Sequence, residues 1–581
     1  MRKILILLLS GCFSLLHAQV KKIKPSVSGT IGVWYEGYGL NLNPKHALPP
    51  LYTQRRPWNQ VRFNFSPNIS FGKLSIPFNV NLAALPTNFA GPYAGIKNQN
   101  FMQYVTNPMN TIGINPKYKW AELQLGTQYL KYSDLSTGDI GAFGAGFDLR
   151  PKTLRIKFFT GQSQRGINFA SGPPLVPGAY ARNHWMFQFG KEKEGKYNVA
   201  INFAKGKDKI SSVNPQLPSI RPQEGFTMSL VTNLFFKKGW YLKTEGAQSN
   251  YTSDLNTPLV DTAVTAFKPF ISAHASTVRD YAGMASIGKK GKNFDIGVGT
   301  KYLGAGFQTT GYPFMQPDRF DLTLNTRFNF MKKNKSNVIA SVGRRVNNVS
   351  KTANRSEQFI GNINWFTQFN DQFSLNLNYN NFGFQSVGTT LSPYNIKNVA
   401  NDFSINPTYS WSNSKMMHAL SFNYTYSRYD EIDAFLLSKT KNNTHTALLS
   451  WVPVYLTKDI SPDFSILYFN NQTPINFPTP SILKTRIATF STGISFPAAK
   501  KKLKLRGQLQ YNYEKINAFT PNHNILANGS VDWKLTKKLV WQTTMNTNLF
   551  RFGSQKAPLV RPGYLESFMR TGFSYQFSSS K

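Results

Sequence analysis

The chain has 581 residues, of which 41% are hydrophobic, 14% aromatic and 16% charged, and its formal charge is +40. Soluble globular chains usually contain about 25% charged residues, so this composition disfavours a series of soluble domains. Beyond the N-terminus no apolar run reaches the ~20 residues of a membrane-spanning helix, which excludes a helical membrane protein. Few charges combined with many aromatic residues are typical of a transmembrane β-barrel.

The N-terminus has the pattern of a secretory signal peptide. The basic start Met1-Arg2-Lys3 is followed by an apolar stretch that closes at Ala18, before Gln19. The pattern predicts a signal peptide over residues 1–18 and a single barrel domain over residues 19–581. An alternative is a lipoprotein box, in which Cys12 would become the lipidated first residue. Cleavage after Ala18 would remove the only cysteine and exclude disulfides in the mature chain.

Strict alternation of apolar and polar residues then recurs along the chain in blocks of ten to fifteen. The clearest blocks lie at 320–330, 373–380 and 503–514. Successive side chains of a strand face opposite sides, so each block has one apolar and one polar face. Soluble sandwich strands average ~5–6 residues, whereas a tilted membrane strand needs ~9–11. The blocks therefore predict an all-β fold, a single transmembrane antiparallel up-and-down barrel of about 26 strands, with 22 or 24 left open.

Connections between the blocks alternate between short and long. Short turns such as 237–239 are typical of the periplasmic side of outer-membrane barrels, and long loops of the external side. An even strand number would place both termini in the periplasm, and the predicted location is the outer membrane of a Gram-negative bacterium. Because barrels of ~22 or more strands need a filled lumen, we expect the long loops 165–183 and 252–278 to fold inward, or a partner to occupy the lumen.

A family resemblance supports this interpretation. The Ala18-Gln19 junction, the Asn- and Tyr-rich strands and the segment 140–151 resemble large outer-membrane β-barrel proteins of Bacteroidota. The final block, 565–577, is similar to the C-terminal assembly signal of outer-membrane proteins. The resemblance implies a porin-like barrel without a defined substrate. The chain departs from TonB-dependent receptors, because the predicted strands begin near residue 26 and leave no room for a plug domain.

Eight basic residues fall on the polar faces of predicted strands and hence in the predicted lumen. These lumen cations are Arg62, Arg155, Lys157, Lys243, Lys301, Arg327, Lys504 and Arg506. Rings of Lys and Arg favour anions in a pore, so the pattern indicates an anion-preferring lumen. Carboxylates such as Asp321 and Glu245 share the polar faces, and pairing with them is the alternative interpretation.

A second set of cations clusters in the short turns. These turn lysines are Lys237, Lys238, Lys289, Lys290, Lys332, Lys333, Lys500, Lys501, Lys502, Lys537 and Lys538. They predict an electropositive periplasmic rim that attracts anionic lipid headgroups or docks an acidic protein partner. The alternative is that lysine-rich turns merely end strands and favour solubility.

Motifs for catalysis, cofactors or metals are weak. The histidines show no metal-ligand spacing, and no Gly-x-Ser-x-Gly elbow is present. A calcium site around 430–433 is disfavoured, because no loop matches an EF-hand. We therefore expect no enzyme activity, cofactor, metal or nucleic-acid partner. The predicted function is a pore or transporter for small, anionic solutes. The alternative is a scaffold subunit of an outer-membrane secretion or assembly complex that docks partners through the turn lysines.

Overall fold

The structure is a computed structural model of the whole chain. It describes residues 25–43, 56, 59–84, 101–107, 110–169, 178–217, 220–260, 270–330, 335–350, 355–386, 396–433, 438–475, 481–517, 519–553 and 563–579. The predicted signal peptide 1–18, its cleavage site and Cys12 lie outside the described residues. Within them, no helix is long and apolar enough to cross a membrane.

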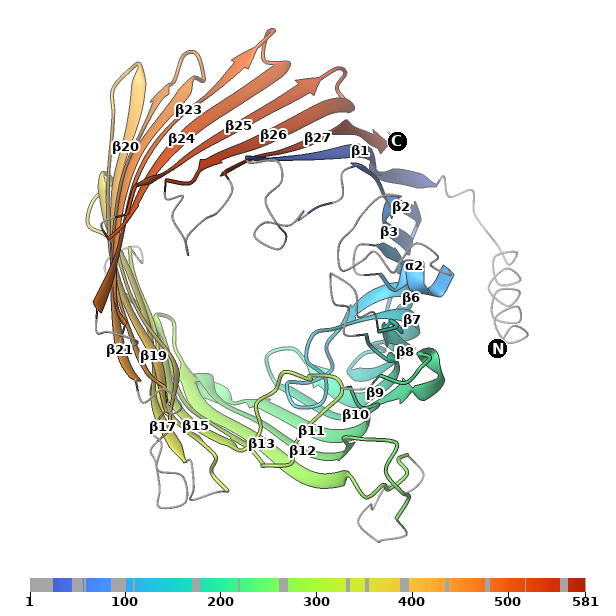
Figure 1. Cartoon of the computed structure of the whole chain (residues 1–581). Helices are drawn as coiled ribbons and strands as arrows, with labels where there is room; N and C mark the ends of the chain where they lie inside the picture. The colour runs from blue at the N-terminus through green and yellow to red at the C-terminus, as the bar shows by residue number, and fades with distance from the viewer. Residues whose placement is uncertain are drawn as a thin grey trace.

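The described chain forms one closed antiparallel β-barrel (Figure 1), in which strands that are consecutive in sequence pair and β27 returns to β1. The strands are β1 (Ser26–Asn43), β2 (Asn59–Phe71), β3 (Leu74–Ala84), β4 (Thr111–Ile114), β5 (Lys117–Tyr118), β6 (Ala121–Leu130), β7 (Ile140–Leu149), β8 (Leu154–Gln164), β9 (Ala181–Lys193), β10 (Tyr197–Lys209), β11 (Glu224–Phe235), β12 (Trp240–Thr252), β13 (Thr277–Lys290), β14 (Phe294–Leu303), β15 (Arg319–Phe330), β16 (Ser336–Asn347), β17 (Ser356–Gln368), β18 (Phe373–Ser386), β19 (Ile396–Ser412), β20 (Met416–Asp433), β21 (Ser438–Tyr455), β22 (Ser461–Ile475), β23 (Ser481–Ala498), β24 (Leu503–Ile516), β25 (Asn522–Lys534), β26 (Leu539–Arg551) and β27 (Gly563–Ser578). The described helical elements are α2 (Phe101–Val105), η2 (Ile210–Ser212) and η3 (Lys237–Gly239).

Two of these elements share one position in the barrel. Both β4 and β5 pair with β3 on one side and with β6 on the other, so the barrel has 26 strand positions. Pro116 lies between them and has no N–H for the ladder, which interrupts the strand. On β6, Gly126 faces Gly113 of β4 and has a φ of +81°, and a Cβ there would lie 1.8 Å from the Ile112 carbonyl oxygen. The prediction of an all-β barrel of about 26 strands is confirmed.

The strand registers show which side chains face the lumen. Asp321 on β15 is paired in register with Arg345 on β16 and bonds it, so these polar positions share a face. The opposite face carries exposed apolar side chains, among them Leu230 (53% exposed), Ile287 (57%) and Phe490 (51%). An apolar exterior and a polar interior are the arrangement of a barrel surrounded by lipid. The fold is therefore that of an outer-membrane β-barrel.

Both described ends of the barrel lie at the edge of the short turns. Ser28 near the start of β1 pairs with Ser578 at the end of β27, and the Ser579 backbone N–H donates to the Val27 carbonyl. The short turns 237–239 and 499–502 end strands at the same edge. That this edge faces the periplasm stays a prediction.

Candidate functional site

Two connections lie inside the barrel against its inner wall: segment 131–139, between β6 and β7, and segment 304–318, between β14 and β15. Figure 1 shows them as cyan and yellow-green chain on the inner side of the ring. The first is held by Glu245, an inward-facing and buried residue of β12. Its two carboxylate oxygens accept the backbone N–H groups of Asp134 and Leu135, each at 3.1 Å.

The second segment fastens onto the first. The Thr309 hydroxyl donates to the Ser136 carbonyl at 2.7 Å, and the Gly138 N–H donates to the Gly311 carbonyl at 3.2 Å. The hydroxyl of Ser249, an inward residue of β12, donates a hydrogen bond to the backbone carbonyl of Gln308 in segment 304–318. Because buried backbone groups need partners, these bonds make the two segments one hydrogen-bonded unit with the wall.

Apolar contacts complete the unit. Leu135 and Phe307 are fully buried and pack with Ala247 and Ala282 of the wall. Tyr132 covers a second apolar patch of inward side chains. Its burial raises the pKa of the hydroxyl above the usual range of tyrosine. The second patch consists of Leu130, Ala142, Phe159, Met186 and Ala204. Burial of apolar surface contributes about 25 cal/mol per Å², so it adds to the hydrogen bonds that hold the segments inside.

The sequence prediction that loop 252–278 folds inward was wrong for its described residue Phe270, and the prediction for loop 165–183 stays a prediction. Phe270, in the β12–β13 connection, stacks on Phe226 with ring centres 4.9 Å apart and packs at a tilt against Trp185, with ring centres 5.9 Å apart. Both partners occupy outward positions, so this part of 252–278 lies outside the wall, as its green trace in Figure 1 shows. The described part of 165–183 packs through Tyr180 against Leu217 of the next connection. In β8 the alternation of apolar and polar residues fails, and apolar residues occupy both faces of the strand. This pattern indicates apolar contacts on the inner face of the wall, and it was missed in the sequence.

All eight predicted lumen cations occupy inward positions, but several are neutralised by neighbours. Arg62 Nε lies 3.2 Å from Glu36 Oε2, and Arg155 Nη1 lies 3.3 Å from Glu192 Oε2. Each pair joins adjacent strands, so the alternative interpretation, pairing with carboxylates of the same face, holds for these two. Their charge adds little to the field of the lumen.

Three other cations are engaged in different ways. Lys157 is buried, and its Nζ lies 4.2 Å from the centre of the Tyr132 ring. Lys301 is partly buried and faces Asp321 in the register of the neighbouring strand. Lys243 is exposed and contacts a tyrosine ring. Cation–π contacts of this kind contribute about 0.5–2 kcal/mol, so Lys157 in particular has a structural role in the wall.

Arg327, Lys504 and Arg506 are the three predicted lumen cations that remain exposed without an ion pair among the described residues. Arg327 belongs to β15, and the other two belong to β24, so they occupy separate parts of the wall. Arg327 and Lys504 face Asp295 and Asp532 in register, although no ion pair forms between them, whereas Arg506 has serines opposite it on both sides. The charge of Arg506 is therefore the most available to solutes in the lumen.

Other inward arginines were missed by the sequence analysis. Arg319 and Arg345 both bond the Asp321 carboxylate, at 2.9 and 2.8 Å. Arg182 forms a bidentate pair with Asp208, with distances of 2.7 and 2.9 Å. Bidentate arginine–carboxylate geometry is among the strongest polar contacts in proteins. The polar alternation of their strands could have identified these residues.

The turn lysines lie along the short-turn edge. Lys237 and Lys238 are exposed in η3, and the lysines of the 500–502 and 537–538 turns are exposed as well. Lys289 lies 5.5 Å from the Trp240 ring, and Lys290 is exposed beside it. Lys332 and Lys333 lie outside the described residues. Among the described turn lysines, Lys501 forms an ion pair with Asp459 of a neighbouring turn, with 2.5 Å between Nζ and Oδ2.

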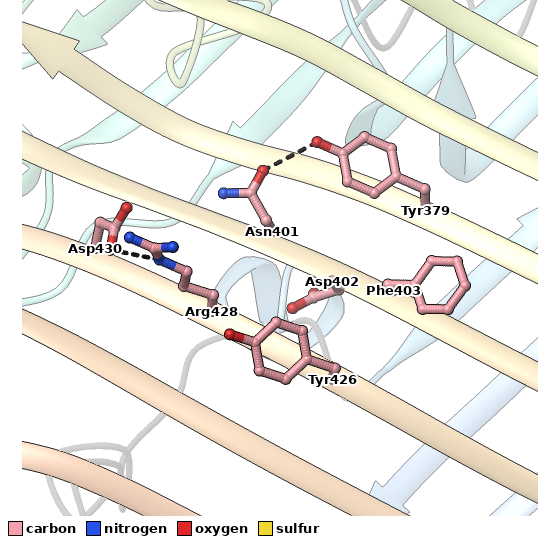
Figure 2. A pocket seen from close by; sticks show the side chains of 7 residues that line it. All are labelled: Tyr379, Asn401, Asp402, Phe403, Tyr426, Arg428 and Asp430. Atoms are coloured by element: carbon pink, nitrogen blue, oxygen red, sulfur yellow. Dashed lines mark hydrogen bonds and ion pairs between the residues drawn. The ribbon is translucent and has the colours of Figure 1, made fainter.

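A shallow pocket of about 540 Å³ lies on the outer face of β18–β20 (Figure 2). The Tyr379 hydroxyl donates to Asn401 Oδ1 at 3.0 Å, and Arg428 Nε donates to Asp430 Oδ1 at 3.1 Å. Tyr426 adds a ring to the wall of the pocket. These side chains occupy outward positions, so the pocket combines aromatic surface with the Arg428–Asp430 ion pair on the lipid side of the barrel, and Asp402 adds a second carboxylate to its lining.

The described residues contain no group of three or more His, Cys, Asp or Glu side chains that could hold a metal ion. Asp430, part of the disfavoured calcium segment, lies within β20 and bonds Arg428 rather than forming a loop site.

No protein-family model and no curated protein matches the chain. Solved structures that resemble it include the P pilus usher (PapC) translocation pore, with 8% identity, a TM-score of 0.40, and coverage of 94% of this chain and 100% of that one. The FrpB iron transporter of Neisseria meningitidis matches with 10% identity and a TM-score of 0.38, covering 94% and 82% of the two chains. OccAB2 of Acinetobacter baumannii matches with 10% identity and a TM-score of 0.31, covering 67% and 100%. At such low identities and TM-scores, none of these bears on what this chain does.

Proposed function

We propose that the protein is an outer-membrane pore or transporter for small, anionic solutes. The observation that carries this proposal is the inner wall, where the exposed cations Arg327, Lys504 and Arg506, which form no ion pair within the described part of the chain, face a lumen that segments 131–139 and 304–318 enter.

The physical argument rests on the charge that faces the lumen. Fixed cations on a low-dielectric wall attract anions and repel cations, and rings of Lys or Arg give pores an anion preference. A barrel of 26 positions encloses a wide lumen, which must be narrowed before charge on the wall can select solutes. Segments bonded to the inner wall supply such narrowing on the side of β6–β15.

Reversal of the exposed lumen cations should reverse the ion preference. The purified barrel is placed in a planar bilayer under a salt gradient, and the sign of the reversal potential gives the selectivity. We expect anion preference in the native protein and cation preference after Arg327→Glu, Lys504→Glu and Arg506→Glu. The matched control reverses three exposed turn residues, Lys500, Lys537 and Lys538, and should leave the sign unchanged. A silent bilayer from folded, heat-modifiable protein would refute the pore.

A scaffold role is the second candidate, and the exposed turn lysines on one edge favour it. Their positive potential suits an acidic periplasmic partner. Charge reversal at Lys237, Lys500 and Lys502 should then abolish co-purification of that partner from native envelopes while conductance is retained. Reversal of Arg327 and Arg506 is the control and should leave the complex intact. Co-purification that survives reversal of the turn lysines would contradict this role.

A further inference from the structure

An aromatic row on the outer face marks one boundary of the apolar band near the long loops. The Tyr424 hydroxyl lies 2.8 Å from His445 Nδ1, and the Tyr511 hydroxyl lies 2.7 Å from His523 Nδ1. All four side chains occupy outward positions of their strands. Tyrosine and histidine rings with a polar tip suit the interface between hydrocarbon and headgroups.

A second aromatic row lies toward the short turns. The rings of Trp411 and His418 are 4.8 Å apart, and those of His418 and Trp451 are 6.0 Å apart. His418 and Tyr426 share the outward face of β20, and at ~3.3 Å per residue they are about 26 Å apart along the strand. With a strand tilt of ~40°, this corresponds to about 20 Å of height, close to the ~25 Å apolar band of such barrels. The two rows therefore bracket the hydrocarbon.

Basic residues gather on the outer face at and just beyond the Tyr–His row. Arg428 follows Tyr426 by two positions on the same face of β20, and Lys515 follows Tyr513 in the same way on β24. We call the whole set the outer basic belt. It consists of Arg428, Lys441, Lys484, Arg486, Lys515 and Arg551.

Within the residues that the structure describes, few carboxylates lie near the belt. Arg428 pairs with Asp430, which also faces Lys441 in register and is the only carboxylate at an outward position near this end of β18–β26 within the described residues. Asp402, at an inward position, also lines the pocket of Figure 2.

The other five cations are exposed and have no ion pair in the part of the chain that the structure describes. The belt residues lie on five different strands, and Arg486 and Lys515 are direct neighbours in register. Because these cations lie at the height of the lipid headgroups and lack carboxylate partners among the described residues, we expect them to bind an anion from outside the protein.

We propose that the outer basic belt binds the phosphate groups of lipid headgroups in the leaflet at the long-loop edge. The pocket of Figure 2 forms one end of the belt, where the Arg428 guanidinium meets a phosphate and the rings of Tyr426 and Phe403 contact the adjoining apolar part of the lipid. Guanidinium and ammonium groups bond phosphate oxygens strongly, and headgroup attraction contributes about 1 kcal/mol per basic residue near an anionic surface. The belt lies on the opposite face of the wall from the lumen, so it stands apart from the proposed pore.

The test uses native mass spectrometry of the purified full barrel in detergent, titrated with bis-phosphorylated lipid A, monophosphorylated lipid A and phosphatidylcholine. We expect binding to fall in that order. The variant Lys441→Gln/Arg486→Gln/Lys515→Gln should bind bis-phosphorylated lipid A about a hundredfold more weakly, since each neutralised cation costs about fivefold. Adding Arg428→Gln should weaken binding by about another fivefold.

The matched control neutralises three exposed cations on the lumen face of the wall, Arg327, Lys504 and Arg506, and should bind lipid A as the native barrel does. Heat-modifiable migration confirms that each variant is folded. Equal binding by the belt variant and the native barrel would overturn the proposal, as would an equal loss in the control. Competition by inorganic phosphate at the same concentration as the lipid would also overturn it, because the site would then recognise a soluble anion.

Discussion

The substitution Glu245→Ala should release segment 131–139 from the inner wall and enlarge the conducting path. The variant leaves the N–H groups of Asp134 and Leu135 without their acceptors. Leu135 is fully buried, and a buried, unsatisfied N–H costs about 1–3 kcal/mol, where 1.4 kcal/mol is a tenfold change in equilibrium. We therefore expect the docked form to lose about a factor of ten relative to the undocked form. The readout is larger and noisier single-channel conductance.

Two further variants make this result specific. Glu245→Gln keeps one carbonyl oxygen as acceptor, so its conductance should lie between those of the native protein and Glu245→Ala. Glu357→Ala removes a carboxylate that pairs with Arg344 on the outer face of the wall, where both side chains are exposed, and should not change conductance. Unchanged conductance in folded Glu245→Ala would show that the segment does not limit the path.

The substitution Asp321→Asn should produce the largest loss of stability. Its carboxylate is 10% exposed and bonds both Arg319 and Arg345. Lys301 faces it from the adjacent strand. Removing one partner of a buried ion pair costs about 3–5 kcal/mol, because the remaining charges lose their compensation. We expect a lower urea midpoint for unfolding in detergent, together with stronger anion preference in the bilayer, because three cations of the inner wall become uncompensated.

Asp371→Asn is the matched control for this variant. Asp371 pairs with Lys335 at 3.2 Å, but its side chain is 95% exposed. Exposed pairs contribute about 0–1 kcal/mol, so the urea midpoint should hardly move. If Asp321→Asn proves as stable as Asp371→Asn, the ion pairs of Asp321 with Arg319 and Arg345 do not stabilise the barrel.

The outer basic belt and the inner wall use the same strands for different tasks. On β24, Arg506 faces the lumen and Lys515 faces outward, because their positions differ by an odd number of residues. Substitutions at lumen-facing positions should therefore leave lipid binding unchanged, and substitutions at outward positions should leave ion selectivity unchanged. The selectivity and lipid-binding experiments can be combined in one set of variants for this reason.

The sequence by itself determined the architecture. Alternation such as that of 373–380 has a period of two, which only a strand with two different faces satisfies, and the length of the blocks matched a membrane crossing. The strand number and the closed antiparallel barrel were confirmed on this basis, and the role of the eight predicted lumen cations stays a prediction. The local pattern was sufficient because the face to which a side chain points depends only on the position of its residue along the strand.

Tertiary structure alone decided which loops enter the lumen and which cations stay unpaired. Segment 131–139 docks because Glu245, more than a hundred residues away, presents two acceptors to it. The belt likewise depends on the register of strands from β20 to β26, as Arg486 and Lys515 illustrate. Loop sequences with similar apolar content can fold to either face of the wall, as Phe270 and Phe307 do. The side is set by complementary groups on distant strands, whose alignment no local pattern contains.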